Sequence, residues 1–326
     1  MPRLTVIIVN YNAGDRLGRC LDCLARQTFA DFETIVVDNG SADGSIEKAR
    51  REYPFATYAE AGANLGFAAA NNRAARAAAG EWLVFLNPDA YADPDWLAEL
   101  VAASDRYPWA DAFGSTQINA HDPSKIDGAG DVFHVLGIPY RGHFGWPVEK
   151  LPSEGECFSP CAAAAMYRKS VFDKLGGFDE RFFCYGEDVD LGFRLRLSGG
   201  RAVQVHSARV LHEGSGVTGR RSEFSIYHGH RNRIWIAAKN FPGLLYWLSA
   251  PFRAAADFIL LVKHALNGLG GAYWRALKDG YGRAHEFRTD PQARLLRGSK
   301  SGAEVGVMIE WSIMGLAKRQ ASIRPL

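Results

Sequence analysis

Residues 82–89 have the sequence WLVFLNPD, in which five apolar residues run without a break into an Asn-Pro-Asp corner. Such a short apolar run is typical of a strand that is buried on both faces of a parallel sheet. Pro88 lacks a backbone donor and biases Asn87 toward an extended conformation, so the run ends in a stiff corner. A better helix cap follows at Asp93. We therefore expect Asp89 to face a metal or polar ligand, with a plain turn residue as the alternative.

Two earlier apolar runs end in polar residues in the same way. Residues 4–9 are followed by Asn10, and residues 34–37 are followed by Asp38. Apolar residues at helical spacing lie between the runs, so the pattern predicts alternating strands and helices and a mostly parallel sheet. Because parallel strands end at one edge, we expect Asn10, Asp38 and Asp89 to border one pocket.

The composition of the 326-residue chain is ordinary for a soluble globular protein, with 47% hydrophobic and 23% charged residues. A net charge of +2 without a basic, aromatic-interleaved stripe argues against nucleic acid as a partner. The charge is nevertheless uneven, because residues 241–326 hold 12 Lys and Arg against 6 Asp and Glu. This basic region predicts attraction to an anionic surface, a membrane included.

The five cysteines, an odd number, favour a reducing compartment over a disulfide scaffold. The amino-terminal residues also lack the features of a secretory signal, so a cytoplasmic location is expected. Cys20 and Cys23 could form half of a zinc site with Cys157 and Cys161. Buried thiols are the favoured interpretation, because Cys20 lies on the core face of a predicted helix.

The last part of the chain is rich in apolar residues that are interrupted by charges. Residues 244–266 contain three charged side chains, so no uncharged stretch reaches the ~20 residues of a membrane-spanning helix. We expect an amphipathic helix pair that packs on the rest of the chain, contacts a sister chain or, as we favour, lies peripherally on a membrane. Residues 288–303 are expected to be mobile, and residues 305–316 predict one last helix.

Six motifs resemble, in order and spacing, those of the inverting family 2 glycosyltransferases, which have the GT-A fold. The matching stretches are VIIVNYN (6–12), ETIVVDNGSADGS (33–45), NLGFAAANN (64–72), FLNPDA (85–90), GGFDERFFCYGEDVDLGFRLR (176–196) and LHEGSG (211–216). LNPD and NLGF look most like the rhamnosyltransferase-like members, which build bacterial surface polysaccharides.

The resemblance implies an α/β fold, with a Rossmann-like, mostly parallel sheet flanked by helices. The GT-A catalytic domain would cover residues 1–240, with a nucleotide-sugar half at 1–110 and an acceptor half at 111–240. A helical extension would follow at 241–326. Within the acceptor half, residues 111–158 are rich in Gly, His and Pro and are expected to form loops over the acceptor site.

The resemblance also implies a nucleoside diphosphate-sugar donor at the carboxyl edge of the sheet. The matching donor-binding positions are Asn10, Tyr11, Asp38, Asn64, Asn71, Asn72, Asn87 and Arg231. The alternatives are a solvated helix face for Asn71 and Asn72 and a structural ion pair for Arg231.

A divalent metal is implied by the position that corresponds to the last acid of the family's Asp-x-Asp motif. Asp89 occupies that position, whereas Asn87 stands where the first acid is usual. His212 matches a position that can supply a further ligand, although a histidine at a strand end is often structural. Oxygen ligands with one imidazole suit Mg²⁺ or Mn²⁺.

Three acids, Glu187, Asp188 and Asp190, lie at the start of a predicted helix directly behind an apolar FFCY segment. Acids in a first turn could simply complement the helix dipole. Adjacent carboxylates also raise one another's pKa, which suits a base near neutral pH. The resemblance implies that Asp188 is the catalytic base and Glu187 contacts the acceptor, and we expect Asp190 to be structural.

The sequence therefore predicts a metal-assisted inverting glycosyltransferase that moves a sugar, rhamnose by the nearest resemblance, to a glycan or lipid-linked acceptor in surface polysaccharide synthesis. A sugar-nucleotide nucleotidyltransferase is an alternative, but residues 12–15 do not form the Gly-rich basic phosphate loop it would need. A non-catalytic binding subunit is a third possibility, against which the acids at 89, 187 and 188 argue. Peripheral contact with the cytoplasmic face of a membrane, or a homodimer, would use the carboxyl-terminal helices.

Overall fold

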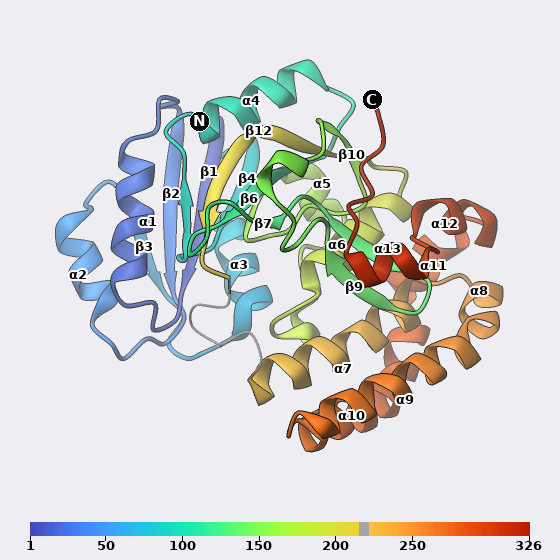
Figure 1. Ribbon diagram of the computed structural model, residues 1–326. Coiled ribbons are helices and arrows are strands. Elements are labelled where there is room, and N and C mark those ends of the chain that lie inside the picture. The colour runs from blue at the N-terminus through green and yellow to red at the C-terminus, as the bar shows by residue number, and fades with distance from the viewer. Residues whose placement is uncertain (215–221) are drawn as a thin grey trace.

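The computed structural model describes residues 1–214 and 222–326 and is built around one large mixed sheet (Figure 1). Its strands have the order β10-β12-β6-β11-β4-β1-β2-β3, with β5 on β12 and β7 on β6, while β8 and β9 form a separate hairpin. The strands are β1 (Leu4–Asn10), β2 (Phe32–Asp38), β3 (Thr57–Glu60), β4 (Trp82–Leu86), β5 (Ala90–Ala92), β6 (Ala112–Asn119), β7 (Ile126–Gly128), β8 (Asp131–His134), β9 (Ile138–Arg141), β10 (Gly155–Cys157), β11 (Ala164–Arg168) and β12 (Ala202–His212).

Helices cover both faces of the sheet and continue into the carboxyl-terminal region. They are α1 (Asp15–Ala25), α2 (Ser45–Glu52), α3 (Gly66–Ala77), α4 (Trp96–Arg106), α5 (Lys169–Lys174), α6 (Glu187–Leu197), α7 (Glu223–Asn240), α8 (Gly243–Leu248), α9 (Ala250–Leu266), α10 (Gly270–Thr289), α11 (Pro291–Gly298), α12 (Gly302–Met308) and α13 (Ile313–Lys318), with 3₁₀ turns η1 (Val148–Lys150) and η2 (Glu180–Phe182). One core packs α1, α2 and α4 on the sheet, and another packs α3, α5 and α6 on its opposite face.

The carboxyl ends of the parallel strands meet at one edge, as the sequence predicts. β1 pairs in parallel with both β2 and β4, and this register sets Asn10 directly opposite Asp38. The short β5 then runs antiparallel to β12, with Ala90 opposite His212. This pairing brings His212 beside Asp89, although the two are far apart in the sequence.

Two local predictions from the amino-terminal half are wrong. α4 begins at Trp96, and Asp93 does not cap it, because its backbone carbonyl instead accepts the N–H of Trp96 in a preceding turn. The segment predicted as loops over 111–158 also contains a full strand, β6, between β11 and β12. Residues 112–118 of this strand are buried although several of them are Gly or polar, so the composition of the strand does not reveal that it lies in the core.

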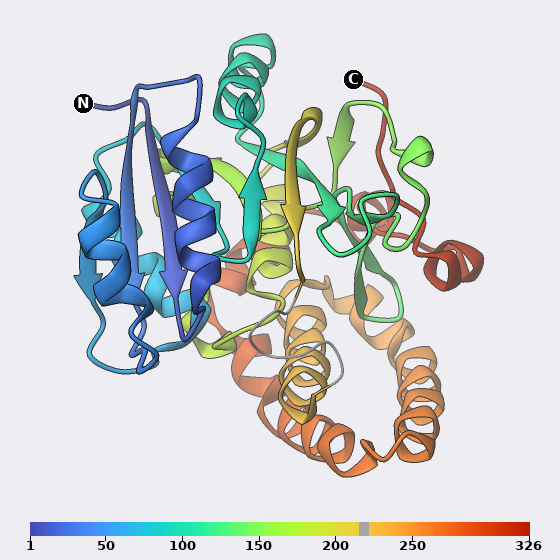
Figure 2. The same cartoon turned by 60° about the vertical axis from the view of Figure 1, so that its left-hand side comes forward.

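The carboxyl-terminal helices pack on the sheet domain through a third core. In Figure 2 the yellow and orange helices lie together beneath the sheet, whereas the red end of the chain lies beside it. α7 packs along α10, and residues of α7 and α10 share this core with Phe133 of β8. α8 and α9 form the predicted helix pair. Among the described residues, no helix combines the length and the hydropathy that crossing a bilayer requires.

The end of the chain differs from the prediction. The segment expected to be mobile contains α11, and the single helix expected at 305–316 is divided into α12 and α13. The division is tertiary in origin, because Glu310 exchanges backbone hydrogen bonds with Phe133 and Val135 at the end of β8. Arg324 likewise pairs with Glu156 of β10. The helical region is thus tied to the sheet domain at several points.

Candidate active site

A cavity of about 500 Å³ lies at the carboxyl edge of the sheet, and we call it the donor cavity. Its lining residues are Val9, Tyr11, Asn39, Asn64, Gly66, Phe67, Asn87, Pro88, Asp89, Arg141, Phe183, Cys184, Tyr185, His212 and Phe224. The predicted residues Tyr11, Asn64, Asn87, Asp89 and His212 are therefore brought together in one wall.

Asn39 is a member of this wall that the sequence analysis did not select. Its Nδ2 donates to Asn64 Oδ1 at 2.9 Å, and its Oδ1 accepts the N–H of Leu65 at 2.9 Å. The amide thus fixes the residues before α3 against the end of β2. Its position directly after Asp38, at the end of a predicted strand, is the feature of the sequence that could have identified Asn39 as a site residue.

The wall formed by residues 183–185 has an unusual backbone. Phe183 and Tyr185 have φ values of 67° and 72°, a left-handed region that costs non-glycine residues about 1–3 kcal/mol each. Gly66, at φ 83°, faces this turn, and a Cβ there would lie 2.5 Å from the Phe183 ring. Glycine is required in the NLGF motif because the two segments approach so closely.

His212 and Asp89 form a buried corner of the donor cavity that fits a divalent cation. His212 Nδ1 lies 2.7 Å from Asp127 Oδ2, while Nε2 lies 3.4 Å from Asp89 Oδ1. Nε2 is buried and makes no hydrogen bond within the described residues. A carboxylate on one ring nitrogen with the other nitrogen aimed at a second carboxylate is the arrangement of metal-ligating histidines. The residues that would hold the ion are Asp89 and His212.

Arg141, on β9, connects this corner with a second cavity. Its guanidinium pairs with Asp127, and its Nη1 lies 3.3 Å from His212 Nδ1. Asp127 Oδ2 accepts from both groups, so the shorter contact places the Nδ1 proton of His212 toward Asp127, and the approach of Nη1 to Nδ1 brings two donors together without a hydrogen bond between them. Neither Asp127 nor Arg141 was selected from the sequence, since both lie in short strands without an apolar period.

The second cavity, of about 270 Å³, adjoins the donor cavity, and we call it the base cavity. Residues that line both cavities are Phe67, Asn87, Arg141, Cys184 and Tyr185. Glu187 and Asp188, at the first turn of α6, and Asp131, on β8, also line the base cavity. Asp89 and Asp188 thus face adjoining spaces.

The acids of the base cavity are held in a low-dielectric setting. Asp188 Oδ2 accepts the N–H of Ala162 at 3.1 Å, and Oδ1 accepts that of Val189 at 2.8 Å. Burial raises the pKa of Asp188, although these backbone hydrogen bonds oppose the rise. Burial and the charge of Asp188 raise the pKa of Glu187 well above its ordinary value. Such shifts are typical of groups that exchange protons at a site.

Asp131 is a further acid that the sequence analysis missed. Burial and the neighbouring Asp188 raise its pKa well above the ordinary value. Ligand atoms of Asp131, Cys161 and Asp188 lie within 4.8 Å of one another. Burial also raises the pKa of the Cys161 thiol, which disfavours the thiolate that a metal would need. We therefore interpret this group as an acidic cluster around Asp188, without a metal.

The cysteines follow the buried-thiol interpretation. Cys20, Cys157 and Cys161 are buried, and all five cysteines are free thiols. Within residues 1–214 and 222–326, they do not assemble into a four-cysteine cluster. The packing of Cys20 against the core, with its thiol toward the carbonyl of Asn87, accounts for its position.

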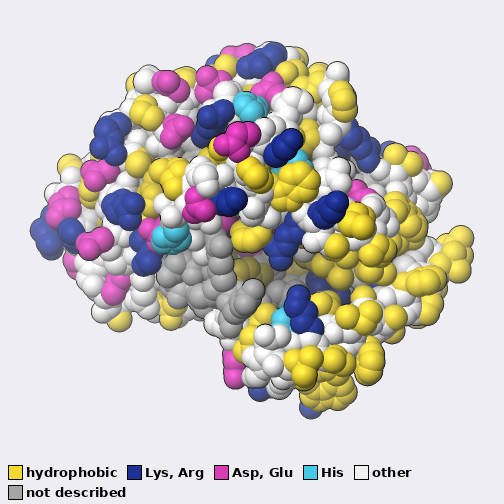
Figure 3. Space-filling model, viewed as in Figure 1, with side chains coloured by type: hydrophobic (Ala, Val, Ile, Leu, Met, Phe, Trp, Pro, Cys, Tyr) yellow, Lys and Arg dark blue, Asp and Glu magenta, His cyan; other side chains and the backbone are white. Residues whose placement is uncertain are grey.

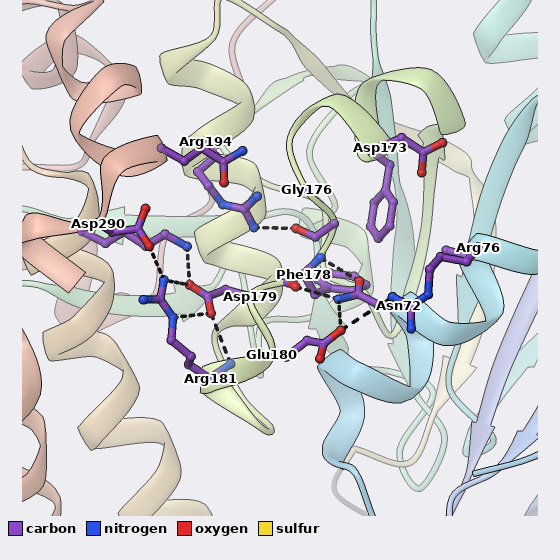
Figure 4. Close-up of a pocket in the computed structure, with 15 residues that line it drawn as sticks. Asn72, Arg76, Asp173, Gly176, Phe178, Asp179, Glu180, Arg181, Arg194 and Asp290 are labelled. Atoms are coloured by element: carbon purple, nitrogen blue, oxygen red, sulfur yellow. Dashed lines mark hydrogen bonds and ion pairs between the residues drawn. The ribbon is translucent and has the colours of Figure 1, made fainter. Parts of the chain in front are cut away.

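Asn72 lies in a different cavity, of about 450 Å³, between α3 and residues 176–181 (Figure 4). Its Nδ2 donates to the carbonyl of Phe178 at 2.8 Å, and its Oδ1 accepts the N–H of Phe178 at 2.9 Å. Asn71 donates to the carbonyl of Phe67 within its own helix. Both asparagines are buried, so the solvated-face alternative is wrong. The structure does not bring them to the donor cavity.

Three further predicted donor residues also lie behind the cavity wall. Asn10 donates to the hydroxyls of Ser41 and Ser45, at 3.0 and 2.9 Å, and Asp38 accepts the N–H of Ser41 at 3.1 Å. These contacts shape the loop after β2. Arg231 donates to the carbonyl of Phe182 and to Asn232, and lines neither cavity.

The last two residues of the LHEGSG motif, at 215 and 216, lie outside the described residues. Glu213 of the same motif is described. It accepts hydrogen bonds from Tyr91 at 2.6 Å and from Arg16 at 2.6 Å. These contacts join the end of β12 to β5 and α1, and so support the corner that holds His212.

Asp190 is the fully buried acid at the centre of a polar network under α6. It accepts hydrogen bonds from Arg194 at 2.8 Å, Lys239 at 2.8 Å and Asn240 at 2.9 Å. Asp190→Ala is expected to lower the free energy of unfolding by about 3 kcal/mol, because two buried cations lose their shared anion. Urea unfolding measures this, with the exposed Glu286→Ala as control. Equal stability of the two variants would contradict the network's structural role.

Comparisons with known proteins agree with this geometry. Residues 5–176 match the family model described as glycosyl transferase family 2. The chain is 34% identical over 274 residues to an N-acetylglucosaminyl-diphospho-decaprenol L-rhamnosyltransferase of Mycobacterium tuberculosis, a match that covers 77% of this chain and 88% of the relative. It is 32% identical over 241 residues to the O-antigen biosynthesis protein RfbC of Myxococcus xanthus, covering 66% of this chain and 17% of that protein.

Solved structures confirm the GT-A fold. The mannosyltransferase PcManGT of Pyrobaculum calidifontis, in complex with GDP-Man and Mn²⁺, is similar with a TM-score of 0.54 and 20% identity, covering 88% of this chain and 87% of that one. GalNAc-T7 with UDP, GalNAc and Mn²⁺ is similar with a TM-score of 0.59 and 17% identity, covering 73% and 48%. Since the family model covers more than half of the chain, and a relative is 34% identical over most of it, this chain is a glycosyltransferase and belongs to family 2.

Proposed function

We propose that the chain transfers a sugar from a nucleoside diphosphate-sugar to a lipid-linked glycan acceptor, with inversion of configuration. The observation that carries this proposal is that the two cavities adjoin: Asp89 and His212 line the donor cavity, and Asp188 lines the base cavity. Asn87 and Arg141 form the wall that both spaces share. Rhamnose is the proposed sugar, because a rhamnosyltransferase that acts on a decaprenol-linked substrate is 34% identical to this chain.

The donor occupies the donor cavity in this proposal. Tyr11 and Asn64 contact the nucleoside, with Asn39 holding Asn64 in place. The diphosphate lies toward Asp89 and His212, which would hold Mg²⁺ or Mn²⁺. A divalent ion at these ligands would offset the negative charge that the departing diphosphate gains. Arg141, in the shared wall, adds a fixed positive charge beside the same phosphates.

Asp188 performs the proton transfer. The acceptor hydroxyl enters the base cavity, and a carboxylate oxygen of Asp188 takes its proton as the hydroxyl oxygen attacks the anomeric carbon. The bond from that carbon to the diphosphate oxygen breaks on the opposite side, so configuration inverts in one displacement. Burial and the charge of Asp188 raise the pKa of Glu187, which favours the protonated form that donates a hydrogen bond to the acceptor.

Asp127 is a positioning residue for the proposed metal site. Asp127→Asn is expected to weaken Mn²⁺ binding about 10–100-fold, because the amide no longer fixes His212 with Nε2 facing the cavity. Isothermal titration of Mn²⁺ with a nucleoside diphosphate measures the loss. The exposed Asp122→Asn, on the same connecting segment, serves as control. Unchanged Mn²⁺ affinity in Asp127→Asn would show that this hydrogen bond does not orient the ligand.

The experiment that tests the function is a panel of UDP-, dTDP- and GDP-sugars, each with and without Mn²⁺. We expect one base to raise the melting temperature by several degrees, only with metal present, because a ligand at 100 times its Kd stabilises by about 2.7 kcal/mol. Transfer of that sugar to an N-acetylglucosaminyl-diphospho-prenol of short chain length completes the test. Failure of every nucleotide to bind would overturn the proposal.

A further inference from the structure

The exposed face of α9 is apolar, whereas its buried face carries charge. Phe258 and Ile259 are 67% and 66% exposed, and Leu266 is 84% exposed. Arg253 and Asp257, in contrast, are buried. A surface helix of a soluble protein normally has the opposite arrangement. This inversion indicates that water is not the natural surrounding of the outer face of α9.

The same apolar surface continues onto α8, which packs against α9. Leu244, Trp247 and Leu248 of α8 are all more than 60% exposed. Figure 3 shows hydrophobic side chains gathered over the lower right of the molecule, where Figure 1 places these helices. We call this surface the α8–α9 face. Contiguous exposed apolar surface of this extent marks an interaction site.

The charge of this region selects the partner. Lys263 is the only charged side chain at an exposed position of α9, and the α8–α9 face contains no acid. Residues 241–326 as a whole carry 12 Lys and Arg against 6 Asp and Glu. An apolar helix face whose one exposed charge is a lysine, in a region of net positive charge, is suited to the boundary between headgroups and acyl chains of an anionic bilayer.

The α8–α9 face is also rigidly connected to the base cavity. On the inner side of α9, Asp257 pairs with Arg233 of α7, whose guanidinium also donates to the Tyr273 hydroxyl at 2.8 Å. Arg233 itself lines the base cavity with Asp188. Arg233 therefore links the inner side of α9 directly to the wall of that cavity.

We propose that the α8–α9 face lies on the surface of an anionic lipid bilayer and holds the base cavity next to it. A lipid-linked acceptor would then keep its prenyl chain in the bilayer while its sugar reaches Asp188. This part of the inference rests on the proposed function, whereas binding of the face to lipid does not.

Sedimentation of the full chain with vesicles tests the proposal. Wild type is expected to bind vesicles of phosphatidylcholine and phosphatidylglycerol (70:30) at least tenfold more tightly than phosphatidylcholine alone. The triple variant Trp247→Ser, Phe258→Ser, Ile259→Ser is expected to lose at least tenfold of that binding. Phe55→Ser, at an exposed phenylalanine beyond α2, is the matched control and should bind like wild type. Unchanged melting temperatures exclude unfolding as the cause.

Two results would overturn the proposal. One is a triple variant that binds the mixed vesicles like wild type. The other is wild type that fails to bind them, and if that wild type forms a stable dimer that the triple variant dissociates, the partner is a second copy of the chain.

Activity separates this inference from the proposed function. The triple variant should keep its rate with a soluble short-chain acceptor and lose at least tenfold with the acceptor embedded in vesicles. Vesicle binding without transfer of any sugar would overturn the proposed function and leave the docking surface supported.

Discussion

The Asp188→Asn variant is expected to lose about a thousandfold in kcat, while its affinity for the donor nucleotide changes less than about twofold. Asparagine keeps the size of the side chain, and its single oxygen keeps one of the two backbone hydrogen bonds that Ala162 and Val189 donate to the two oxygens of Asp188. It cannot accept the proton of the acceptor hydroxyl. Since Asp188 lines the base cavity and not the donor cavity, the donor should bind as before.

The pH profile gives an independent reading of the same residue. The base acts as a carboxylate, so activity is lost as pH falls through its pKa. Burial raises that pKa, so the acid limb of kcat should lie above the range of an ordinary aspartate. In Asp188→Asn this limb should disappear, leaving a low rate that is flat on the acid side. If the acid limb persists in Asp188→Asn, a group other than Asp188 causes it.

Two control variants make the result specific. Asp173→Asn changes an exposed acid on α5 and should leave kcat unchanged. Glu187→Gln should change kcat and the KM for the acceptor only a few-fold, because the amide can still donate the hydrogen bond that the protonated acid donates. A larger loss of kcat in Glu187→Gln than in Asp188→Asn would reverse the two roles.

The sheet edge could be predicted because its signals are local. The run at 82–86 is apolar on both faces. The residues that follow a buried strand of a parallel sheet lie at the carboxyl edge of that sheet. Tyr11, Asn87 and Asp89 therefore reach the donor cavity as expected. The place of Glu187, Asp188 and Asp190 in the first turn of α6 could be predicted for the same reason, because the signals for the start of a helix are also local.

Asp127, Asp131 and Arg141 could not be predicted, because their strands are three or four residues long. Such segments show no apolar period, and their sequence reads as a loop. These residues reach the site through contacts with residues that are distant in the sequence, as Asp127 contacts His212. Such contacts are set by the tertiary structure and leave no pattern in the local sequence.

Asn72 shows a different limit. A buried amide within a helix is compatible with a ligand contact or with a protein contact, and only the tertiary structure decides. Here Gly177 lies so close that a Cβ on it would be 2.6 Å from Asn72 Oδ1. The amide therefore joins the NLGFAAANN and GGFDERFF motifs, and its hydrogen bonds to Phe178 complete that joint.

The Asp89→Ala variant is expected to abolish the metal-dependent stabilisation by nucleotide and to lower kcat/KM by about a thousandfold, equivalent to about 4 kcal/mol. The reason is the chemistry of its corner. Asn87 supplies an amide where the Asp-x-Asp pattern has a second carboxylate, so Asp89 would be the main anionic ligand beside His212 in the proposed metal site. Thermal shift with nucleotide, with and without Mn²⁺, measures the first effect, and steady-state transfer measures the second.

Asp95→Asn, an exposed acid shortly after the same corner, is the control and should match wild type. The complementary change is Asn87→Asp, which adds a carboxylate to the wall of the donor cavity. If Asp89 acts through a cation, this variant should bind Mn²⁺ more tightly than wild type, because the added charge strengthens an oxygen-ligand site. If Asp89 instead contacts the sugar directly, a second carboxylate should leave Mn²⁺ affinity unchanged, and Asp89→Ala should weaken donor binding equally with and without metal. That pattern would remove the metal from the proposed mechanism while keeping Asp89 in the donor cavity.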